Sequence, residues 1–358
     1  MSLIDCELYM NDVIRVANEF DNFKNSKVLI TGASGLICSF LVDVLMYRNL
    51  HYGDNIYIYL MCRNEKKLKE RFNYYNLNEL NIIIQDICES FDFDYDFDYI
   101  INGASNTHPI QYSTNPVGTI TTNVMGLNNI LKYCIKHKPK RIFMMSSVEI
   151  YGENKGDVDL FDENYLGYIN CNTVRACYPE SKRVCESLCQ SYISQYGLDI
   201  VIGRLSRVFG PTMQKDDSKA LAQFIRNAVD GKDIILKSDG KQLFSYTYMS
   251  DAVSAILKIL FYGECGEAYN ISDRLSDITL KDLACILAKY NNKKVVFELP
   301  TNTEKKGYST ATKAVLDSAK IRKLGWKPYY NIETGLQNTV KILKKMECDE
   351  NTKYKKQY

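Results

Sequence analysis

Lys27-Val-Leu-Ile-Thr-Gly-Ala-Ser-Gly-Leu-Ile-Cys38 runs from an apolar strand through a glycine-rich turn into the start of an apolar helix. Gly32 permits a tight turn, and Gly35 lets backbone N–H groups approach a pyrophosphate at the positive end of the helix. Cys38 stands where a third glycine is expected, and a small thiol should fit there with a modest packing change. A plain strand-turn-helix unit is the alternative. The stretch therefore predicts a dinucleotide site, with these residues against the cofactor: Gly32, Ser34, Gly35, Leu36 and Ile37.

Apolar strands alternate with helical patterns after this turn. We expect a helix over 119–136 and strands over 55–62, 81–87, 99–102 and 141–145. This alternation predicts an α/β fold of the Rossmann type, with a doubly wound parallel sheet. A chain of 358 residues can also form a second, smaller α/β domain. The expected units are a helical extension (1–25), a dinucleotide-binding domain (26–203), a mainly substrate-binding domain whose chain can cross back to the sheet (204–345) and a charged tail (346–358).

The ends of the next three strands carry residues suited to the rest of a dinucleotide. An acidic residue after the second strand would bind the ribose 2′-hydroxyl, but the chain has Arg63, whose guanidinium suits a 2′-phosphate and favours NADP over NAD. A solvated charge at the start of a helix is the alternative for Arg63. Asp86 and Ile87 are placed to hold an adenine by carboxylate and apolar contact. The residues expected to close over the cofactor are Asn102, Gly103 and Ala104.

Tyr178 precedes Lys182 by four residues at the start of a long helical pattern. On an α-helix this spacing puts both side chains on one face, so the ammonium can stabilise a phenolate. A tyrosine with an ordinary pKa of about 10 is a poor base at neutral pH, and lowering that pKa by roughly three units requires about 4 kcal/mol. A merely structural pair is the alternative. Two other pairs share the spacing but start in a turn or cross a poor helix interior, Tyr151/Lys155 and Tyr290/Lys294.

Ser147 and Glu149 follow the strand over 141–145, at the strand end where ligands of open α/β sheets bind. We expect Ser147 to donate a hydrogen bond to the substrate oxygen that Tyr178 deprotonates. Glu149 would then handle a second proton. The alternative is that Ser147 and Glu149 are ordinary loop residues.

The composition excludes several classes of partner. A net charge of +2 gives no general attraction to nucleic acid or to an acidic membrane, so we expect a small-molecule partner. The 12 cysteines lack zinc-site spacing and are typical of reduced thiols in a cytoplasmic protein, and with 3 histidines no metal site is expected. The start of the chain is acidic and polar, and no apolar run reaches the roughly 18 residues of a membrane span. We therefore expect neither export nor membrane insertion.

Several further motifs carry a family resemblance. They are Phe209-Gly-Pro211, Tyr248-Met-Ser-Asp-Ala252 and Leu324-Gly-Trp326, together with the glycine turn, Ser147 and the Tyr178/Lys182 pair. Over about residues 25–345 the chain resembles extended short-chain dehydrogenase/reductases of the nucleotide-sugar epimerase/dehydratase type. Within that family it is most similar to UDP-glucuronate decarboxylases, through Ala104-Ser-Asn-Thr-His-Pro109, Glu163-Asn-Tyr-Leu-Gly167 and Arg175-Ala-Cys-Tyr178.

This resemblance implies a tightly bound NAD or NADP that oxidises carbon 4 of a nucleotide-linked hexose and later returns the hydride. Tyr178 would take the hydroxyl proton, Ser147 would hydrogen-bond the same oxygen, and Lys182 would hold the nicotinamide ribose. The resulting 4-keto sugar would lose carbon dioxide, lose water or be epimerised. The resemblance also implies a homodimer, formed through a four-helix contact that includes the helix of Tyr178.

Val148 and Glu149 bear on the choice between these reactions. dTDP-glucose 4,6-dehydratases have an aspartate at the position of Val148 that protonates the leaving hydroxyl, whereas decarboxylation of a β-keto acid needs no such acid. Val148 therefore favours a decarboxylase, although GDP-mannose dehydratases also lack that aspartate. Simple epimerases usually lack the glutamate, so Glu149 counts against epimerisation. A dinucleotide-sensing regulator without turnover is the non-enzyme alternative, and the complete set of catalytic residues argues against it.

Two substitutions concern the substrate. Relatives commonly bind the sugar-nucleotide diphosphate with an arginine at the position of Phe244, and they commonly carry an asparagine at the position of Arg207. We hypothesise that the phosphate-binding charge has moved to Arg207, with Lys219 or Lys241 assisting. The matched motifs add two expected substrate contacts, Ser105 and Tyr248.

Overall fold

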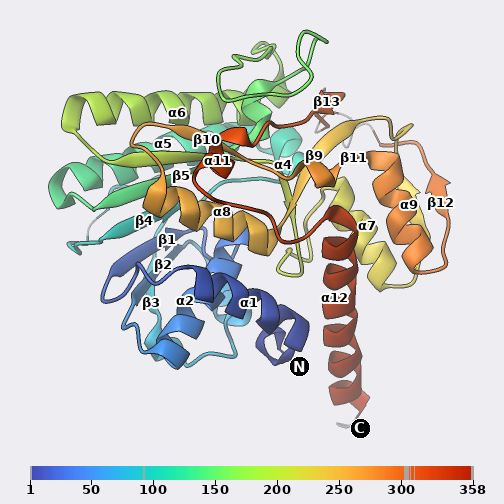
Figure 1. Ribbon diagram of the computed structural model, residues 1–358, viewed down its shortest axis with the longest axis horizontal. Helices are drawn as coiled ribbons and strands as arrows, with labels where there is room; N and C mark the ends of the chain where they lie inside the picture. Colours follow the sequence, from blue (N-terminus) through green and yellow to red (C-terminus); the bar gives the residue numbers. More distant parts are fainter. Residues whose placement is uncertain (1, 92, 302–305, 307, 310, 356–358) are drawn as a thin grey trace.

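The chain folds around a large parallel β-sheet with helices on both faces (Figure 1). The computed structural model describes residues 2–91, 93–301, 306, 308–309 and 311–355. The sheet has the order β10-β6-β5-β4-β1-β2-β3, and every neighbouring pair is parallel, which confirms the expected doubly wound α/β fold. The strands are β1 (Lys27–Thr31), β2 (Tyr57–Cys62), β3 (Asn81–Ile84), β4 (Tyr99–Asn102), β5 (Arg141–Ser147), β6 (Ile200–Leu205) and β10 (Ala268–Ile271).

The strand order reverses between β1 and β4. From β1 the chain adds β2 and β3 on one side, and it then returns to place β4 on the other side of β1. Thr31 at the end of β1 pairs with Asn102 at the end of β4, so the segments after these strands leave the sheet side by side. Ligands of open α/β sheets bind outside the carboxyl ends of the strands at such a reversal. The fold therefore puts the glycine turn in the expected ligand position.

Helices cover both faces of this sheet. α5 and α6 pack together on one face, and α1, α2 and α8 pack together on the other (Figure 1). Strands enclosed in this way are mainly apolar, as the central buried residues of β1, β4 and β5 show. The helices are α1 (Glu7–Glu19), α2 (Leu36–Tyr52), α3 (Glu65–Arg71), α4 (Pro109–Thr114), α5 (Pro116–His137), α6 (Cys177–Tyr196) and α8 (Met249–Tyr262).

The N-terminal helix α1 is fixed to the body by apolar packing and by several polar contacts. Its inner face buries Val13 among other residues, and the helix packs against α2 and α8. Arg15 forms an ion pair with Asp251 of α8 at 2.9 Å, and the Tyr248 hydroxyl donates to Asp12 at 2.9 Å. The segment expected to be a helical extension is therefore part of the packed structure.

A smaller unit lies beside the carboxyl ends of the large sheet, at the right of Figure 1. Its central strand β9 pairs with β7, β11 and β13, while β8 pairs with β12. Between these strands the chain returns to the large sheet through α8 and the edge strand β10. The elements of the smaller unit and its surroundings are β7 (Arg207–Phe209), β8 (Ile234–Leu236), β9 (Leu243–Tyr248), β11 (Asp277–Thr279), β12 (Val295–Phe297), β13 (Lys313–Ala314), α7 (Ala220–Val229), α9 (Leu280–Tyr290), α11 (Ala319–Lys323) and α12 (Ile332–Lys355).

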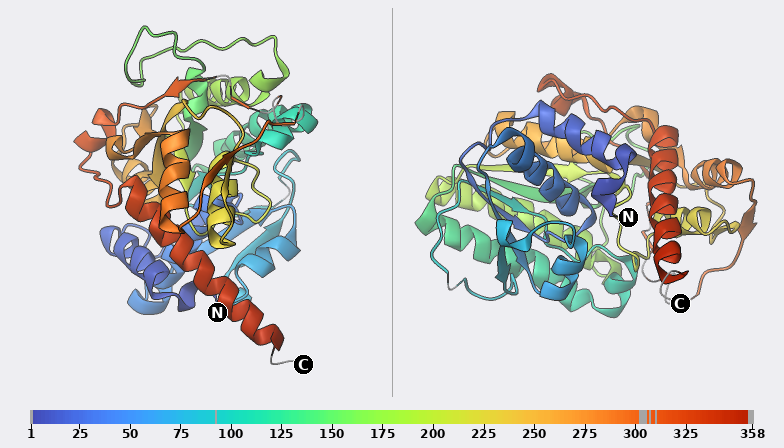
Figure 2. Two further views of the ribbon diagram at one scale, coloured as in Figure 1. Left: turned by 90° about the vertical axis from the view of Figure 1, so that its right-hand side faces the viewer. Right: turned by 90° about the horizontal axis from the view of Figure 1, so that it is seen from below.

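Short 3₁₀ helices connect several of these elements. They are η1 (Leu3–Asp5), η2 (Leu77–Glu79), η3 (Val148–Tyr151), η4 (Val174–Ala176) and η5 (Arg274–Ser276). At the other end of the chain, α12 continues through Lys355, so the segment expected to be a charged tail is helical up to that residue. Figure 2 shows the C-terminal end of α12 projecting from the body.

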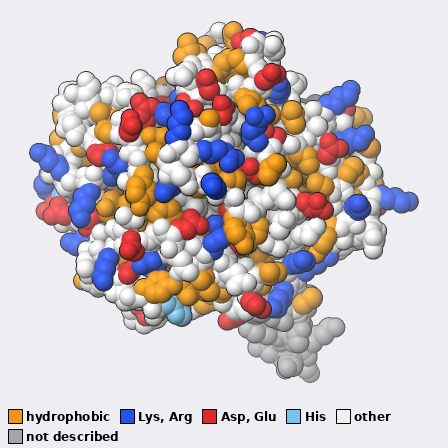
Figure 3. All heavy atoms as spheres, in the orientation of Figure 1, with side chains coloured by type: hydrophobic (Ala, Val, Ile, Leu, Met, Phe, Trp, Pro, Cys, Tyr) orange, Lys and Arg blue, Asp and Glu red, His pale blue; other side chains and the backbone are white. Residues whose placement is uncertain are grey.

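Charges of both signs are mixed on the face of the molecule drawn in Figure 3. Lys and Arg side chains lie among Asp and Glu side chains there, as the net charge of +2 leads one to expect. Among the helices of the described residues, none combines the length and the apolar character needed to span a membrane.

Candidate active site

A cleft of about 750 Å³ lies between the carboxyl ends of the large sheet and the smaller unit. One wall comes from the segments after β1, β2, β4 and β5, and the other comes from β7, β9 and α7. Four expected catalytic residues line the cleft, Ser147, Glu149, Tyr178 and Lys182, and we call them the catalytic corner. The expected cofactor and substrate residues that also line it are Gly32, Ser34, Gly35, Leu36, Ile37, Arg63, Ile87, Gly103, Ala104, Ser105, Arg207 and Lys219.

The glycine turn after β1 leaves room for a diphosphate. Gly32 has φ +66°, and a Cβ at this position would lie 2.7 Å from the carbonyl oxygen of Gly103. Gly35 precedes α2, which starts without a side-chain cap. The first N–H groups of an α-helix have no acceptor within the helix, so they can bind an anion. The residues present therefore fit the pyrophosphate of a dinucleotide.

Cys38 fits at the helix–strand contact because Gly103 has no side chain. A Cβ on Gly103 would lie 2.4 Å from Cys38 Sγ. The thiol is buried and donates to the carbonyl oxygen of Thr31 at 3.6 Å. Burial raises the pKa of the Cys38 thiol to about 12, so we expect this thiol to be unreactive. The loss of the third motif glycine is therefore compensated by a glycine on the neighbouring loop.

The residues expected around the adenosine part of the cofactor separate into two groups. Arg63 and Ile87 line the cleft, but Asp86 is not among the lining residues. The Asp86 carboxylate lies 3.7 Å from Arg63 Nη1 and accepts the Cys88 backbone N–H at 2.9 Å. Asn102 also falls outside the lining, because it is buried and its Oδ1 accepts the Thr31 hydroxyl at 2.8 Å. The structure thus assigns Asn102 to the joint between β4 and β1 instead of to the cofactor.

Tyr178 and Lys182 lie in the first turns of α6 and are almost fully buried at the cleft wall. Lys182 Nζ donates to the carbonyl oxygen of Met145 in β5 at 2.8 Å, and it lies 5.9 Å from the centroid of the Tyr178 ring. Ser147, the last residue of β5, accepts the Glu149 backbone N–H at 3.2 Å. Helix α6 and the end of β5 therefore bring together the residues that the sequence indicates.

The pKa of Tyr178 is raised, and the lowered value expected from the sequence is wrong for this structure. Burial of the phenol is the main cause of the raised pKa, and the carboxylate of Glu149 adds to it. The Ser147 hydroxyl and the charge of Arg175 oppose this rise in the Tyr178 pKa. Burial also lowers the pKa of Lys182. The protein's own groups therefore favour the protonated phenol, and a positive charge bound nearby would favour the phenolate.

Two residues that the sequence did not indicate complete this part of the cleft, Arg175 and Tyr112. Arg175 in η4 forms an ion pair with Glu149 at 2.6 Å, and its guanidinium lies 4.6 Å from the centroid of the Tyr112 ring. The Tyr112 ring stacks on Tyr178 with the centroids 4.8 Å apart. Arg175 stands three residues before Tyr178, which was an available signal. Tyr112 comes from α4, so nothing in the local sequence connects it to Tyr178.

On the substrate side of the cleft, Arg207 lies face-on against an aromatic ring. Its guanidinium carbon is 3.4 Å from the centroid of Phe244, which projects from the neighbouring strand β9. Lys219 also lines the cleft, but its Nζ pairs with Asp217 at 3.2 Å.

Two expected substrate residues lie elsewhere. Lys241 pairs with Asp239 at 3.4 Å, and its side chain is 85% exposed on the surface. Tyr248 is buried outside the cleft lining, where its hydroxyl donates to Asp12 of α1. Neither residue therefore lies in the substrate site, because Lys241 points to solvent and Tyr248 binds the N-terminal helix.

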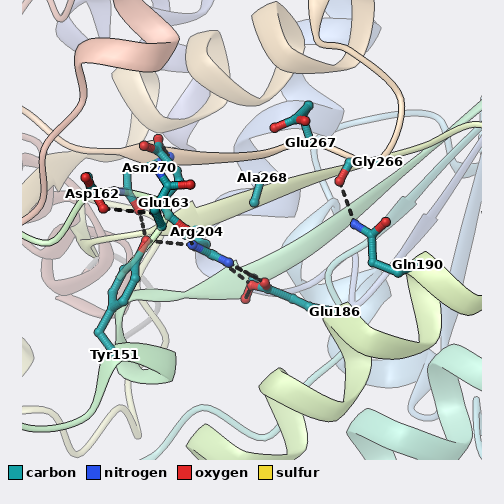
Figure 4. Close-up of polar contacts among 12 residues, drawn as sticks. Tyr151, Asp162, Glu163, Glu186, Gln190, Arg204, Gly266, Glu267, Ala268 and Asn270 are labelled. Carbon is teal, nitrogen blue, oxygen red and sulfur yellow. Dashed lines mark hydrogen bonds and ion pairs between the residues drawn. The ribbon is translucent and has the colours of Figure 1, made fainter. Parts of the chain in front are cut away.

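A group of polar residues next to the catalytic corner connects α6 to the large sheet (Figure 4). Arg204 of β6 contacts both carboxylate oxygens of Glu186 in α6, the shortest at 2.7 Å. Arg204 also donates to the Tyr151 hydroxyl at 2.8 Å, and that hydroxyl donates to Asn270 of β10 at 2.8 Å. Glu186 accepts in addition from the Ser146 hydroxyl in β5. We call Tyr151, Glu186, Arg204 and Asn270 the anchor network, since it fixes α6 against the end of β5.

Comparison with known proteins gives a family match. The model of the NAD dependent epimerase/dehydratase family matches residues 28–272. UDP-glucuronic acid decarboxylase 3 of Arabidopsis thaliana is 31% identical over 87% of this chain and 87% of its own. UDP-glucuronic acid decarboxylase 1 of Xenopus tropicalis is 27% identical over 92% of this chain and 75% of its own.

Solved structures share the fold. The crystal structure of UDP-glucuronic acid 4-epimerase from Bacillus cereus, in complex with UDP-glucuronic acid and NAD, matches with a TM-score of 0.75 at 21% identity, over 89% of this chain and 99% of that chain. The dTDP-glucose 4,6-dehydratase of Streptomyces venezuelae with NAD bound matches with a TM-score of 0.74 at 23% identity, over 89% and 97%.

Proposed function

The chain belongs to the NAD dependent epimerase/dehydratase family, and from this premise we propose that it removes the carboxyl group of a nucleotide-linked uronic acid, as UDP-glucuronate decarboxylases do. The enzyme would oxidise carbon 4 of the sugar, release carbon dioxide from the resulting β-keto acid and reduce the ketone again. Sequence identity of about 30% to several UDP-glucuronic acid decarboxylases supports this substrate class.

The residues of the catalytic corner suit the proton transfers of this sequence. Tyr178 would accept the proton of the carbon 4 hydroxyl, while Ser147 would hydrogen-bond the same oxygen. A bound dinucleotide would supply the hydride acceptor, and Lys182 would contribute to holding it. The raised pKa of Tyr178 favours the protonated phenol, which is the form that returns a proton when the ketone is reduced. Tyr112, stacked on Tyr178, holds the phenol ring in place.

The segment after Ser147 supplies the observation that carries decarboxylation. Val148 lines the cleft and is only 3% exposed, so an apolar side chain stands where dTDP-glucose 4,6-dehydratases have an acid. The next residue, Glu149, has its carboxylate in an ion pair with Arg175 at 2.6 Å. Loss of carbon dioxide from a β-keto acid requires no proton donor at a leaving hydroxyl, because the ketone accepts the electrons. This arrangement therefore supports decarboxylation over dehydration of the dTDP-glucose type.

A nucleotide-sugar 4,6-dehydratase or an epimerase is the second candidate, because solved structures of both kinds share the fold. A dinucleotide-sensing regulator is the non-enzyme candidate. The complete catalytic corner argues against such a regulator, since cofactor binding alone needs no phenol next to a hydroxyl and a carboxylate.

Product analysis tests these candidates directly. The protein, supplied with NAD or NADP, is incubated separately with UDP-glucuronate, dTDP-glucose, GDP-mannose and CDP-glucose, and the products are separated from isomers by liquid chromatography and identified by mass spectrometry. We expect loss of carbon dioxide from UDP-glucuronate. Loss of water from one of the other three would assign a dehydratase, and an isomer of unchanged mass would assign an epimerase. Tight dinucleotide binding with four unchanged substrates would assign the regulator.

We also propose that NADP is the preferred dinucleotide. The support is Arg63, which lines the cleft just after β2. A guanidinium at this strand end favours a 2′-phosphate over a free 2′-hydroxyl.

We further propose a homodimer formed through α5 and α6. The outer surfaces of these helices expose apolar side chains that would be covered by a second copy, Val117, Ile120, Met125 and Val184. Sedimentation equilibrium of the purified protein tests this assembly, and a monomer at micromolar concentration would contradict it.

A further inference from the structure

Arg207 is a cleft residue whose charge is not balanced within the described part of the chain. Its Nη1 is shielded from solvent and has no hydrogen-bond acceptor among the described residues. Burial lowers the pKa of Arg207, so its surroundings disfavour the charged form. Guanidinium N–H groups that are shielded from solvent are normally paired, because a charge left without a partner is unfavourable. Arg207 therefore has the character of an anion-binding residue.

Phe244 gives this guanidinium a rigid support. The ring is 7% exposed and lies in β9 between β11 and β13, so packing fixes its position. With the guanidinium carbon 3.4 Å from the ring centroid, one face of Arg207 is covered. The N–H groups at the edge of a stacked guanidinium still match two oxygens of a phosphate or a carboxylate.

Two of the carboxylates that line the cleft already have other partners. The charge of Glu149 acts on Arg207, but the Glu149 carboxylate pairs with Arg175 at 2.6 Å. Asp217 pairs with Lys219 at 3.2 Å. Glu149 and Asp217 are therefore not available to pair with Arg207, which can bind an anion that enters the cleft. Asp217 also offsets the positive charge of Lys219.

We infer that Arg207, supported by Phe244, binds the diphosphate of the nucleotide sugar. This inference rests on the proposed function, which makes the substrate a nucleotide sugar. Arg207 pairs with Tyr246 in the β7–β9 register, and Phe244 lies two residues from Tyr246 on the same face of β9. A guanidinium at position 207 or at position 244 therefore reaches the same part of the cleft. The diphosphate suits Arg207 better than the uronate carboxylate, because tight binding of that carboxylate would oppose its loss as carbon dioxide.

Binding of sugar-free nucleotides tests the inference. The probes are UDP, dTDP, GDP and CDP, each titrated calorimetrically into the dinucleotide-loaded protein. We expect the wild type to bind at least one of them and Arg207→Gln to weaken that binding about 10- to 100-fold, as loss of a charged hydrogen bond predicts. Arg207→Lys keeps the charge but not the stacked plane, so its affinity should be intermediate. Lys241→Ala, on the surface, is the matched control and should bind as the wild type does.

An exchange of the two side chains sharpens the test. Arg207→Asn alone should lose nucleotide affinity. Adding Phe244→Arg should recover that affinity, because the new arginine on the adjacent strand supplies the missing charge. Should the double variant fail to fold, Phe244→Leu replaces it, with an expected loss of about threefold from the missing cation–π contact. Circular dichroism and dinucleotide affinity confirm that each variant is folded.

Several results would overturn the inference. The first is that the wild type binds none of the four nucleotides. The second is that Arg207→Gln binds a nucleotide as tightly as the wild type does. The third is that Lys219→Ala loses nucleotide affinity while Arg207→Gln does not. If Arg207→Gln weakens the binding of UDP-glucuronate but not that of UDP, Arg207 binds the uronate carboxylate instead of the diphosphate. None of these measurements requires turnover, so failure of the proposed decarboxylation would be seen separately in the product analysis.

Discussion

The anchor network and the cleft both hold charges inside the protein, but they satisfy those charges differently. In the anchor network, Arg204 has Glu186 at 2.7 Å and the Tyr151 hydroxyl at 2.8 Å. In the cleft, burial disfavours the charged forms of Tyr178 and Lys182, as their shifted pKa values show. Helix α6 contributes to both regions within a few turns. The clearest difference lies between two arginines: Arg204 is paired with a carboxylate and a hydroxyl, whereas Arg207 Nη1 in the cleft has no acceptor among the described residues.

The largest effect should come from Tyr178→Phe, which keeps the ring and removes the acid–base group. We expect turnover to fall about 10³-fold, because a positioned general acid–base contributes roughly 10²- to 10⁴-fold. Substrate affinity should change little, since the stack on Tyr112 is retained. Steady-state rates of carbon dioxide release and calorimetric binding measure the two quantities.

Tyr112→Phe is the matched control for this comparison. It removes a hydroxyl from the stacked partner, whose ring lies 4.8 Å from that of Tyr178, and turnover should stay within about tenfold. Equal losses in the two variants would show that the Tyr178 hydroxyl matters no more than the Tyr112 hydroxyl, which would contradict proton transfer by Tyr178.

The next effect compares one substitution at two positions. Arg204→Met breaks a buried ion pair and leaves Glu186 without its main partner, so we expect a loss of about 3 kcal/mol in the free energy of unfolding. Arg207→Met removes a half-buried charge whose Nη1 has no acceptor among the described residues, so stability should be unchanged or slightly higher. Urea unfolding of the two variants measures both values. Equal destabilisation would remove the distinction between the anchor network and the cleft.

A smaller effect should appear in the pH dependence of turnover. The pKa of Tyr178 is raised, so the phenolate is the minor form at neutral pH and the rate should rise as pH increases. Glu149 contributes to the rise in the Tyr178 pKa and Arg175 opposes it. Glu149→Gln should therefore move the acidic limb of the profile to lower pH, and Arg175→Gln should move it to higher pH, each by roughly half a unit to one unit.

Initial rates between about pH 6 and pH 9, on dinucleotide-saturated protein, measure these shifts. The position of the limb is compared, not the maximal rate, because both variants also change the cleft. Shifts of the same sign in the two variants would show that another group controls the profile.

The sequence predicted the fold and the catalytic corner because both depend on local patterns. A strand followed by a glycine turn is contiguous in sequence, and Tyr178 and Lys182 share one helix face by spacing alone. The stack of Tyr112 on Tyr178 joins residues from α4 and α6, which only tertiary packing can specify. The direction of the Tyr178 pKa was missed for the same reason. It depends on burial and on the charges of Glu149 and Arg175, neither of which the spacing of a Tyr–Lys pair contains.

A smaller share of the residues predicted for the substrate than of those predicted for catalysis lies in the cleft. Lys241 lies in the loop before β9, where it pairs with Asp239 at the surface, and the Tyr248 hydroxyl is bound to Asp12 of the N-terminal helix. Arg207 was found because an unusual charge replaced the expected residue type. A chemical mismatch in the sequence was therefore more informative about the substrate side than proximity to a motif.

The smallest effect concerns Arg63 and tests whether the comparison extends to the rim of the cleft. Arg63 is 59% exposed and lies 3.7 Å from Asp86, so its pairing is looser than that of Arg204. Exposed charge pairs contribute about 0–1 kcal/mol, which limits the preference for NADP⁺ over NAD⁺ to about fivefold. Arg63→Ala should abolish this preference by weakening NADP⁺ binding alone, and Asp86→Asn should increase it. Fluorescence titration with both dinucleotides measures the ratio, which should shrink at high salt because exposed charges are screened. If the wild type binds NAD⁺ more tightly than NADP⁺, and Arg63→Ala leaves this ratio unchanged, Arg63 serves only in a structural ion pair at the surface.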